Sequence, residues 1–363
     1  MYNEDEKFVI WLDSLDFGRK KMAEILRLHE HPSDIMEHPA RYISRLSKIL
    51  TDDEYTIFMT SLPAVNTVVN EMTDRHMYAL TFMSPNYPER LLNISLPPMV
   101  LYYAGDITLL EDDSIIAIVG TRKPSKYGEY ATDYFTSNLV KNNFVTISGL
   151  AYGVDTIVAE STLKNDGCTI AVMGCGLDKI YPARNTNLAK QIVVNGGLVI
   201  SEYHAGVGPK QYNFPERNRI ISGLSRGVLV VEGGENSGSL ITANLAIEQG
   251  RSLFVVPANI NSVTASGTNK LLKEYPSACT VNFERIVEDF GYSLVGENEQ
   301  LSIDDIGDLT PEQKIIVDIL SRGELNYDEL ASKSNMDAND LNVLLTEMEL
   351  SGLIVREGNI YSV

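Results

Sequence analysis

The sequence predicts an α/β fold with a doubly wound, mostly parallel sheet at its centre. Six short runs rich in β-branched residues alternate with stretches of helical apolar spacing, which is typical of a parallel sheet with helices on both faces. Most of the runs also end in glycine loops or short polar turns, and such loops meet at the carboxyl edge of the sheet, where ligands bind. The six runs are Ile115 to Val119, Phe144 to Ile147, Thr169 to Met173, Leu198 to Ser201, Val228 to Val231 and Leu253 to Val256. We therefore expect a Rossmann-like core over residues 113–290.

Length and composition define the broad class of protein. The chain has 363 residues, 44% of them hydrophobic and 22% charged, which is typical of a globular protein of two or three domains. No window approaches the ~18 consecutive apolar residues of a membrane span, and the acidic N-terminus does not resemble a secretory signal, so we expect a cytoplasmic protein. The three cysteines and five histidines lack metal-ligand spacing, so we expect no metal site and no disulfide framework.

Charge is divided unevenly along the chain, whose net charge is −19. Residues 1–112 carry 10 basic and 18 acidic side chains, residues 113–290 carry 16 of each, and residues 291–363 carry 4 and 15. Both ends would repel a polyanion. Such a ligand can therefore be held only by a locally basic surface of the central part.

The segments before the core differ in character. Residues 1–75 are expected to be helical, with two helices on either side of the polar turn 16–21, either as a helix-hairpin-helix or sterile-alpha-motif-like unit or as a plain helical scaffold. The scaffold is favoured because the segment is acidic and lacks the Gly-x-Gly of a DNA-binding hairpin. Residues 76–112 contain several prolines and are expected to be a connecting segment packed on the core.

The C-terminal part predicts a winged helix. A charged linker, residues 291–308, precedes three helical stretches and a strand pair across Glu357-Gly358-Asn359 in residues 309–363. The third helix would enter a DNA major groove, yet no Lys or Arg occurs between Asp337 and Leu353. A transcription factor is therefore disfavoured, and we expect this domain to contact a protein and not duplex DNA.

The loops after the strands favour phosphate chemistry. The loop after the first strand, residues 120–126, has one glycine and the cations Arg122, Lys123 and Lys126, so it does not fit the Gly-x-Gly-x-x-Gly of a dinucleotide site. A P-loop is also missing, and we expect no cofactor. Backbone amides and cations at helix N-termini suit phosphates. The alternative for Arg122 is a structural ion pair with Asp155 or Glu232.

Two further segments carry candidate ligand groups. Residues 233–243 combine small residues with the hydroxyls of Ser237, Ser239 and Thr242 at a helix start, where an anion is favoured, although an ordinary helix cap would look the same. Upstream, Arg217 and Arg219 lie two positions apart after a proline, and arginine suits phosphates and bases. The alternative for these arginines is a structural ion pair with Glu202 or Glu232.

These residues make the chain resemble the DNA-processing protein A family, DprA or Smf. Eight motifs occur in the family's order through nearly the whole chain, and a winged helix similar to that of many members follows. The motifs are Tyr87-Pro88-Glu89-Arg90-Leu91; Ile118-Val119-Gly120-Thr121-Arg122 with Tyr127-Gly128; Ser148-Gly149-Leu150-Ala151 with Gly153-Val154-Asp155; Val172 to Asp178 with Tyr181-Pro182; Ser201-Glu202-Tyr203; Phe214-Pro215 with Arg217 to Ile221; Ser237 to Ala243; and Glu248-Gln249-Gly250-Arg251.

The resemblance implies a non-enzymatic protein that binds single-stranded DNA, protects it and delivers it to RecA during natural transformation or recombination. It also implies a homodimer through the Rossmann-like domain. Carried over by position and extended to nearby residues, the DNA-binding set is Gly120, Thr121, Arg122, Lys126, Gly149, Tyr152, Gly174, Arg184, Lys210, Arg217, Asn218, Arg219, Ser237, Gly238, Ser239 and Thr242.

The chain departs from the family pattern at one loop. Tyr152 stands where an arginine is usual and Ala159 where a histidine is common, while Arg184 keeps a positive charge after Tyr181-Pro182. A tyrosine there can stack on a base, or both changes can be neutral drift. The rival class is a nucleoside-monophosphate phosphoribohydrolase of the lysine-decarboxylase-like family, which shares this kind of sheet. Its catalytic glutamate has no counterpart in the loop that begins at Glu232.

Overall fold

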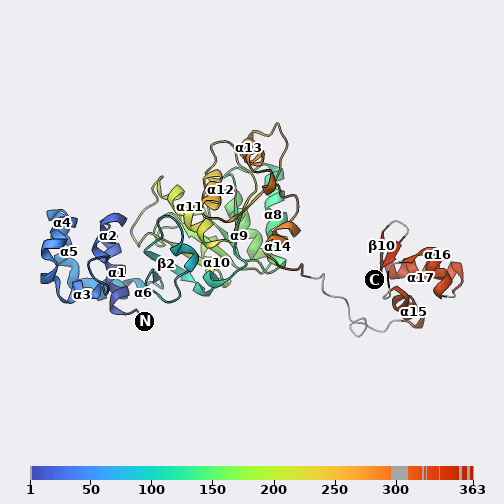
Figure 1. The fold of residues 1–363 in the computed structure, drawn as a ribbon, viewed down its shortest axis with the longest axis horizontal. Helices are drawn as coiled ribbons and strands as arrows, with labels where there is room; N and C mark the ends of the chain where they lie inside the picture. Colours follow the sequence, from blue (N-terminus) through green and yellow to red (C-terminus); the bar gives the residue numbers. More distant parts are fainter. Residues whose placement is uncertain are drawn as a thin grey trace. The chain divides into compact units, whose positions relative to one another are not determined.

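The computed structural model describes residues 2–295, 310–320, 323, 325–334, 336–350, 354–357 and 360–362. Contacts divide the chain into two compact units, Met1–Val295 and Gly296–Val363 (Figure 1). The predicted linker, 291–308, lies outside the described residues from position 296 onward.

The first unit begins with helices whose hydrophobic core also includes Ala79, Val100 and Tyr102, which follow the helices in the chain. Phe8, Trp11 and Phe58 are fully buried there, and the ring centroids of Trp11 and Phe58 lie 5.0 Å apart. Capping boxes at Asn3 and Thr51 begin α1 and α5, because each cap side chain accepts a backbone N–H three residues on. The predicted helix pair around residues 16–21 is confirmed. The elements are α1 Glu4–Ser14, α2 Arg19–Leu26, α3 Ser33–Glu37, η1 Pro39–Arg41, α4 Ile43–Ile49, α5 Asp52–Ser61, η2 Leu62–Ala64 and α6 Val65–Asp74.

An eight-stranded sheet forms the centre of this unit, in the order β1-β2-β6-β5-β4-β3-β7-β8. The six strands from β6 to β8 are parallel to one another. Each predicted run forms one of these six strands within two residues of its expected bounds. The strands are β1 Tyr78–Thr81, β2 Val100–Gly105, β3 Ile116–Val119, β4 Thr146–Ser148, β5 Thr169–Met173, β6 Leu198–Ser201, β7 Gly227–Val230 and β8 Ser252–Val255.

The structure corrects the reading of residues 76–112 as an irregular connection. This segment supplies β1 and β2, which form an antiparallel pair, and β2 pairs antiparallel with β6. Each strand is short, and the prolines lie between the two strands. The sheet is therefore mixed, with an antiparallel edge that connects it to the N-terminal helices.

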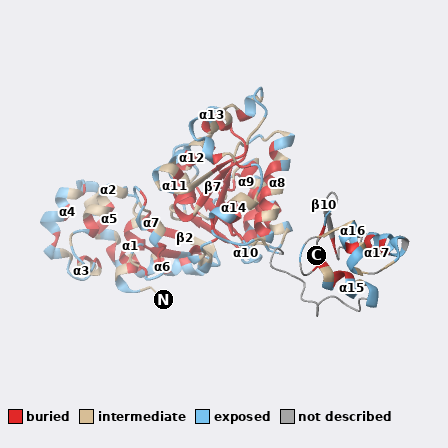
Figure 2. Ribbon diagram, turned by 45° about the vertical axis from the view of Figure 1, so that its right-hand side comes forward, coloured by how far each residue is buried: buried red, intermediate tan, exposed pale blue. Residues whose placement is uncertain are grey.

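Helices cover both faces of the sheet, as the doubly wound expectation requires. Ala117 and Val119 of β3 share a core with α11 and α12, whereas Ile116 and Ile118 pack with α8, α9 and α14 on the opposite face. Figure 2 shows the buried strands between these layers. The elements are α7 Glu89–Leu92, η3 Ile107–Glu111, α8 Lys126–Lys141, α9 Val154–Lys164, η4 Ala183–Asn185, α10 Thr186–Val194, α11 Asn213–Leu224, α12 Gly238–Glu248, η5 Val263–Ala265, α13 Ser266–Glu274, η6 Pro276–Ala278 and α14 Glu284–Asp289.

The second unit has the predicted winged-helix plan. Its buried core includes Ile316, Leu330 and Leu345, one from each of its three helices. The strands form a small sheet in the order β10-β11-β9. The expected turn at Glu357-Gly358-Asn359 lies outside the described residues at positions 358 and 359. The elements are α15 Pro311–Leu320, β9 Leu325–Asn326, α16 Tyr327–Ser334, α17 Ala338–Leu350, β10 Val355–Glu357 and β11 Ile360–Ser362.

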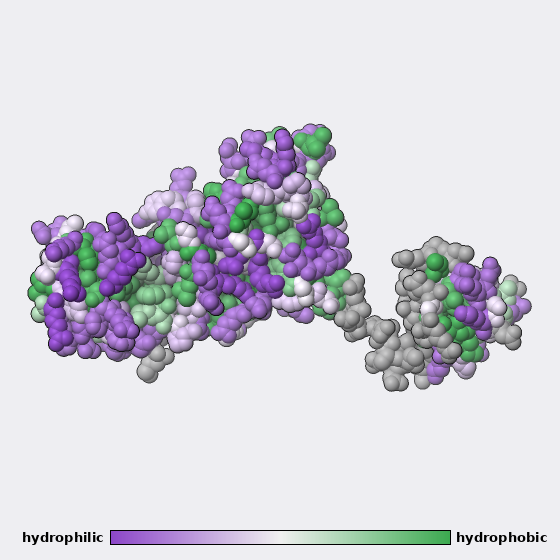
Figure 3. Space-filling view, viewed as in Figure 1, coloured by the Kyte–Doolittle hydropathy of each residue, from purple (hydrophilic) through white to green (hydrophobic). Residues whose placement is uncertain are grey.

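The face of the first unit that Figure 3 shows is mostly polar. In Figure 3 hydrophilic side chains cover most of its visible face, and apolar side chains form small separate patches. None of the helices that the structure describes has both the length and the apolar character that crossing a membrane requires.

Candidate functional site

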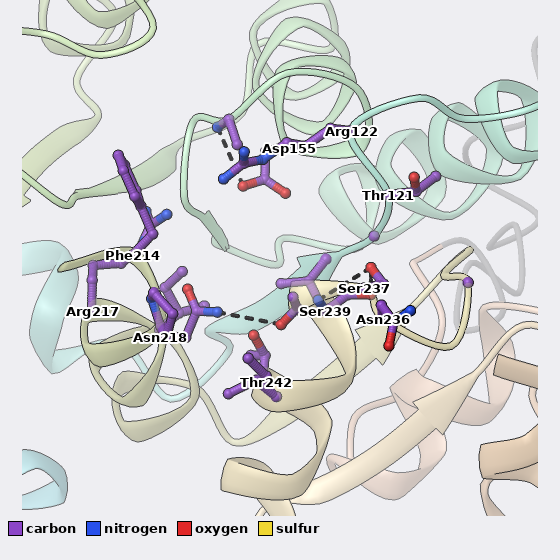
Figure 4. Close-up of a pocket in the computed structure, with 18 of the residues that line it drawn as sticks. Thr121, Arg122, Asp155, Phe214, Arg217, Asn218, Asn236, Ser237, Ser239 and Thr242 are labelled. Carbon is purple, nitrogen blue, oxygen red and sulfur yellow. Dashed lines mark hydrogen bonds between the residues drawn. The ribbon is translucent and has the colours of Figure 1, made fainter. Parts of the chain in front are cut away.

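The loops at the carboxyl ends of the strands surround an open cleft of about 1110 Å³. It lies between the loop after β3, the start of α11 and the start of α12 (Figure 4). Nine of the sixteen predicted DNA-binding residues line it. These are Gly120, Thr121, Arg122, Arg217, Asn218, Ser237, Gly238, Ser239 and Thr242.

Arg122 is the exposed cation of the cleft. Its guanidinium lies 5.8 Å from the centroid of the Phe214 ring, and no ion pair of Arg122 occurs within the described ranges. The loop is held by backbone hydrogen bonds from Thr121 N to Glu232 O at 2.7 Å and from Val154 N to Thr121 O at 3.2 Å. Arg122 is therefore held by its backbone, with its side chain available to a ligand. The alternative of a structural ion pair with Asp155 or Glu232 is not what this geometry shows.

Arg217 forms part of the cleft floor and is only 4% exposed. Its guanidinium donates to the Val172 carbonyl oxygen and lies directly beneath Gly149, where a Cβ would come within 2.3 Å of both terminal nitrogens. Burial lowers the pKa of Arg217 to about 10, so the side chain stays charged at neutral pH. Arg217 therefore supplies positive charge from below the loop, and its guanidinium is not freely accessible to a ligand.

A buried carboxylate lies opposite this arginine. Asp155 Oδ2 accepts from the backbone N–H groups of Gly149 at 3.0 Å and Ala151 at 3.3 Å, which holds the loop after β4 in place. Burial raises the pKa of Asp155 above its ordinary value, and the positive charge of Arg217 opposes that rise. Figure 4 shows Asp155 beside Arg122. The carboxylate lowers the net positive charge of the cleft when it is ionised.

The start of α12 forms the opposite wall. Ser237 caps the helix, and its hydroxyl lies 2.8 Å from that of Ser239. Asn218 of α11 donates its Nδ2 hydrogen to Gly238 O over 3.4 Å (Figure 4). Ser237 is thus an ordinary cap as well as a cleft residue. The positive end of the helix dipole and the hydroxyls face the same space as Arg122, so the cleft can accept an anion.

Three predicted residues lie around a second, smaller groove of about 420 Å³. Tyr152 and Arg184 line it, and Lys126 is paired at 2.7 Å with Glu129, which also lines it. The loop of residues 151–153 separates the two cavities, because Ala151 lines the cleft while Tyr152 and Gly153 line the groove.

Two other predicted residues lie beside the cleft without lining it. Gly174 has a packing role, since a Cβ there would come within 2.9 Å of the Phe214 ring. Lys210 is exposed, with its Nζ 5.8 Å from the Tyr212 ring centroid, and the neighbouring residues Pro209 and Gln211 line the cleft.

Arg219 lies away from the cleft. It is 6% exposed, its guanidinium lies 2.5 Å from Glu202 Oε1, and it also donates to Leu96 O and Glu216 O. Arg19 of α2 bonds the same Glu202 oxygen at 2.6 Å. The alternative stated for Arg219, a structural ion pair with Glu202, is the arrangement found.

Several residues that line the cleft were not among the predicted DNA-binding residues, including Asp155, Phe214 and Asn236. Phe214 precedes the arginines in the segment that contains Arg217, so an aromatic beside cations was a usable signal. Asp155 was named only as a possible ion-pair partner of Arg122 and as part of a family motif, and Asn236 gave no comparable signal. Among the described residues no group of three or more His, Cys, Asp or Glu side chains is arranged to hold a metal ion.

Fold and site together define a Rossmann-like protein whose cleft carries an exposed cation, with a winged helix in its second unit. The family model described as DNA recombination-mediator protein A matches residues 78–291, and the DprA winged helix domain matches residues 304–359. The chain belongs to the DNA processing protein A family, DprA or Smf.

Individual relatives agree with this assignment. The chain is 40% identical over 222 residues to DNA processing protein DprA of Bacillus subtilis, covering 61% of this chain and 73% of the relative. It is 36% identical over 273 residues to Protein Smf of Escherichia coli, covering 74% and 72%.

Two solved structures are similar as well. DNA processing protein A from Streptococcus pneumoniae matches with a TM-score of 0.65 and 29% identity, over 80% of this chain and 99% of that one. The protein from Helicobacter pylori, whose structure gives insights into a unique single-stranded DNA binding mode, matches with a TM-score of 0.54 and 34% identity, over 60% and 97%.

Proposed function

We propose that this chain binds single-stranded DNA in the cleft of about 1110 Å³. The observation that carries the proposal is Arg122, an exposed cation without an intramolecular ion pair in the described residues, beside the Phe214 ring and opposite the start of α12. A cation, an aromatic ring and a helix N-terminus suit the phosphates and bases of an unpaired strand. The single-stranded DNA binding mode of the Helicobacter pylori relative supports the same ligand.

The proposed cellular role follows from the family. A recombination mediator of this type would protect incoming strands and deliver them to RecA in natural transformation or recombination, as a cytoplasmic homodimer formed through the Rossmann-like domain. We assign protein contact to the winged helix, because α17 lacks Lys and Arg while the segment 291–363 has 15 acidic side chains against 4 basic ones.

The proposed role involves no catalysis. The loop after β7 retains no glutamate at the spacing that a phosphoribohydrolase uses. Incubation with AMP should therefore release no free base, and robust turnover would overturn the proposal.

Binding of fluorescent oligonucleotides tests the ligand. The protein should bind single strands much more tightly than duplex of the same length. Its affinity should fall as the salt concentration rises, and the slope of log affinity against log salt should be about −0.7 for each phosphate contacted. Equal affinity for duplex, or no binding to single strands at low salt, would contradict the proposal.

A further inference from the structure

The groove beside the cleft is lined by groups of several kinds. Tyr152 is 45% exposed at its edge, and Arg184 is exposed on η4. The lining also includes two carboxylates, Glu129 and Glu160, and the amides of Asn185, Asn187 and Gln191, and Glu160 is exposed. Lys126 is exposed and held near Glu129 by the ion pair at 2.7 Å.

The loop that carries Tyr152 is held firmly against the Arg122 loop. Gly153 has φ of 77°, and a Cβ there would come within 2.4 Å of Thr121 O, so only glycine allows this close approach. On the other side Thr156 Oγ1 donates to Ala151 O at 2.6 Å, and Asn185 Nδ2 donates to Leu150 O at 2.9 Å. Tyr152 therefore has a defined place on the far side of the loop from the cleft.

The lining distinguishes between the parts of a nucleotide. Carboxylates repel phosphates, so the part of the groove beside Glu129 and Glu160 does not suit the DNA backbone, whereas the cation of Arg184 does. Carboxylate and amide oxygens accept hydrogen bonds from the exocyclic amino groups of cytosine and adenine. The exposed Tyr152 ring offers a face on which a base can stack, and such stacking is largely independent of sequence.

We propose that the groove lined by Tyr152, Arg184 and Glu160 binds an unpaired nucleobase of the strand whose phosphates occupy the neighbouring cleft. The base stacks on Tyr152, and its amino group donates to Glu160. This inference rests on the proposed function and adds a base-binding subsite to it. The strand crosses the loop of residues 151–153 between the two cavities.

Oligonucleotides with and without bases separate this subsite from the phosphate cleft. The full chain and the variant Tyr152→Ala are titrated with a fluorescent oligo-dC and with an abasic oligonucleotide of the same length. Because Tyr152→Ala loses one stacked base, its affinity for oligo-dC should be about five- to a hundredfold lower than that of the wild-type protein. On the abasic strand the two proteins should bind equally, and Tyr152→Phe should retain wild-type affinity for oligo-dC.

Tyr130 provides the matched control. It is an exposed tyrosine of α8, 67% exposed and stacked on Tyr134, and it does not line the groove. Tyr130→Ala should leave both affinities unchanged. If Tyr152→Ala binds oligo-dC as tightly as wild type does, the base subsite is wrong while the cleft proposal stands. If the wild-type protein binds neither probe, the proposed function itself fails.

Glu160→Ala tests the hydrogen bond, because it removes the acceptor oxygens. The wild-type protein should bind oligo-dC more tightly than oligo-dT, because thymine has no exocyclic amino group to donate. The variant should lose most of that difference, while loss of the negative charge raises its affinity for both strands by a similar factor. Equal wild-type affinity for the two strands would overturn the role of Glu160. A groove that serves a protein partner would leave every DNA titration unaffected by Tyr152→Ala, which also overturns the proposal.

Discussion

Two regions flanking α11 use arginine in opposite ways. Towards the N-terminal helices, Arg219 and Arg19 share Glu202 Oε1 at 2.5 and 2.6 Å, so these charges are satisfied within the chain. On the cleft side, Arg122 is exposed and has no ion pair in the part of the chain that the structure describes. The comparison shows that the number of cations does not locate a polyanion site. The proposed site is marked by Arg122, which forms no ion pair among the described residues, although Asp155 lies near it.

The largest expected effect is on stability, in the satisfied region. Arg219→Ala leaves Glu202 with only Arg19 and removes the bonds to Leu96 O and Glu216 O, so the free energy of unfolding should fall by about 3 kcal/mol. Denaturant melts measure this. Arg41→Ala, an exposed arginine of η1, is the control and should change it by less than about 0.5 kcal/mol. An unchanged melt with weakened DNA binding would reverse the contrast between the two regions.

A smaller effect, on DNA affinity, is expected from the carboxylate of Asp155 in the cleft. Asp155→Asn keeps an oxygen for the Gly149 and Ala151 N–H groups but removes a negative charge from the cleft, so single-strand affinity at neutral pH should rise by about fivefold. The stability should rise slightly, because burial disfavours the ionised carboxylate more than the charge of Arg217 favours it. Fluorescence anisotropy gives the affinity. A weaker complex would show that Asp155 assists the ligand.

The same carboxylate predicts a pH dependence. Because burial raises the pKa of Asp155 in the folded protein, the folded state binds this proton at a higher pH than the unfolded chain does. As pH falls through that raised pKa, this group should contribute increasing stability, and single-strand affinity should rise as the carboxylate is neutralised. Affinity titrations from neutral pH downward check the trend, which should be lost in Asp155→Asn.

The smallest effect concerns the acidic second unit. Removing residues 296–363 leaves a unit with its own cores. Because the removed segment is acidic, single-strand affinity should rise by about twofold at low salt. In 1 M salt, where charges are screened beyond ~3 Å, the affinity should not change. Neither form should bind duplex DNA in a gel mobility-shift measurement. Duplex binding by the full chain that disappears on truncation would show that the winged helix binds DNA.

The sequence predicted the parallel strands well because their signal is local. The runs that became β3 to β8 are rich in β-branched residues and most end in turn residues, so local sequence places them. The strands β1 and β2 were missed because they are short, and their place depends on antiparallel pairing with β6, far away in sequence.

The candidate site was predicted in part for the same reason. Loop residues such as Arg122 follow strands whose carboxyl ends must converge, and the cleft brings nine predicted residues together. Arg217 and Arg219 were both predicted to bind DNA, with a structural ion pair as the alternative above all for Arg219, and residues two apart on a helix point to different faces. Which of them meets Glu202 depends on the packing of α2 and residues 201–203 against α11, and periodicity does not give that information.

The most direct measurement is the salt dependence of single-strand binding by Arg122→Ala. Because Arg122 is exposed and its loop is held by backbone bonds, the melting temperature should not change. Affinity should fall by about tenfold, the value of one charge-assisted hydrogen bond, and the slope of log affinity against log salt should become shallower by about 0.7. Arg41→Ala should change neither. An unchanged slope together with a lower melting temperature would assign Arg122 to the structure of the protein and contradict the cleft as the DNA site.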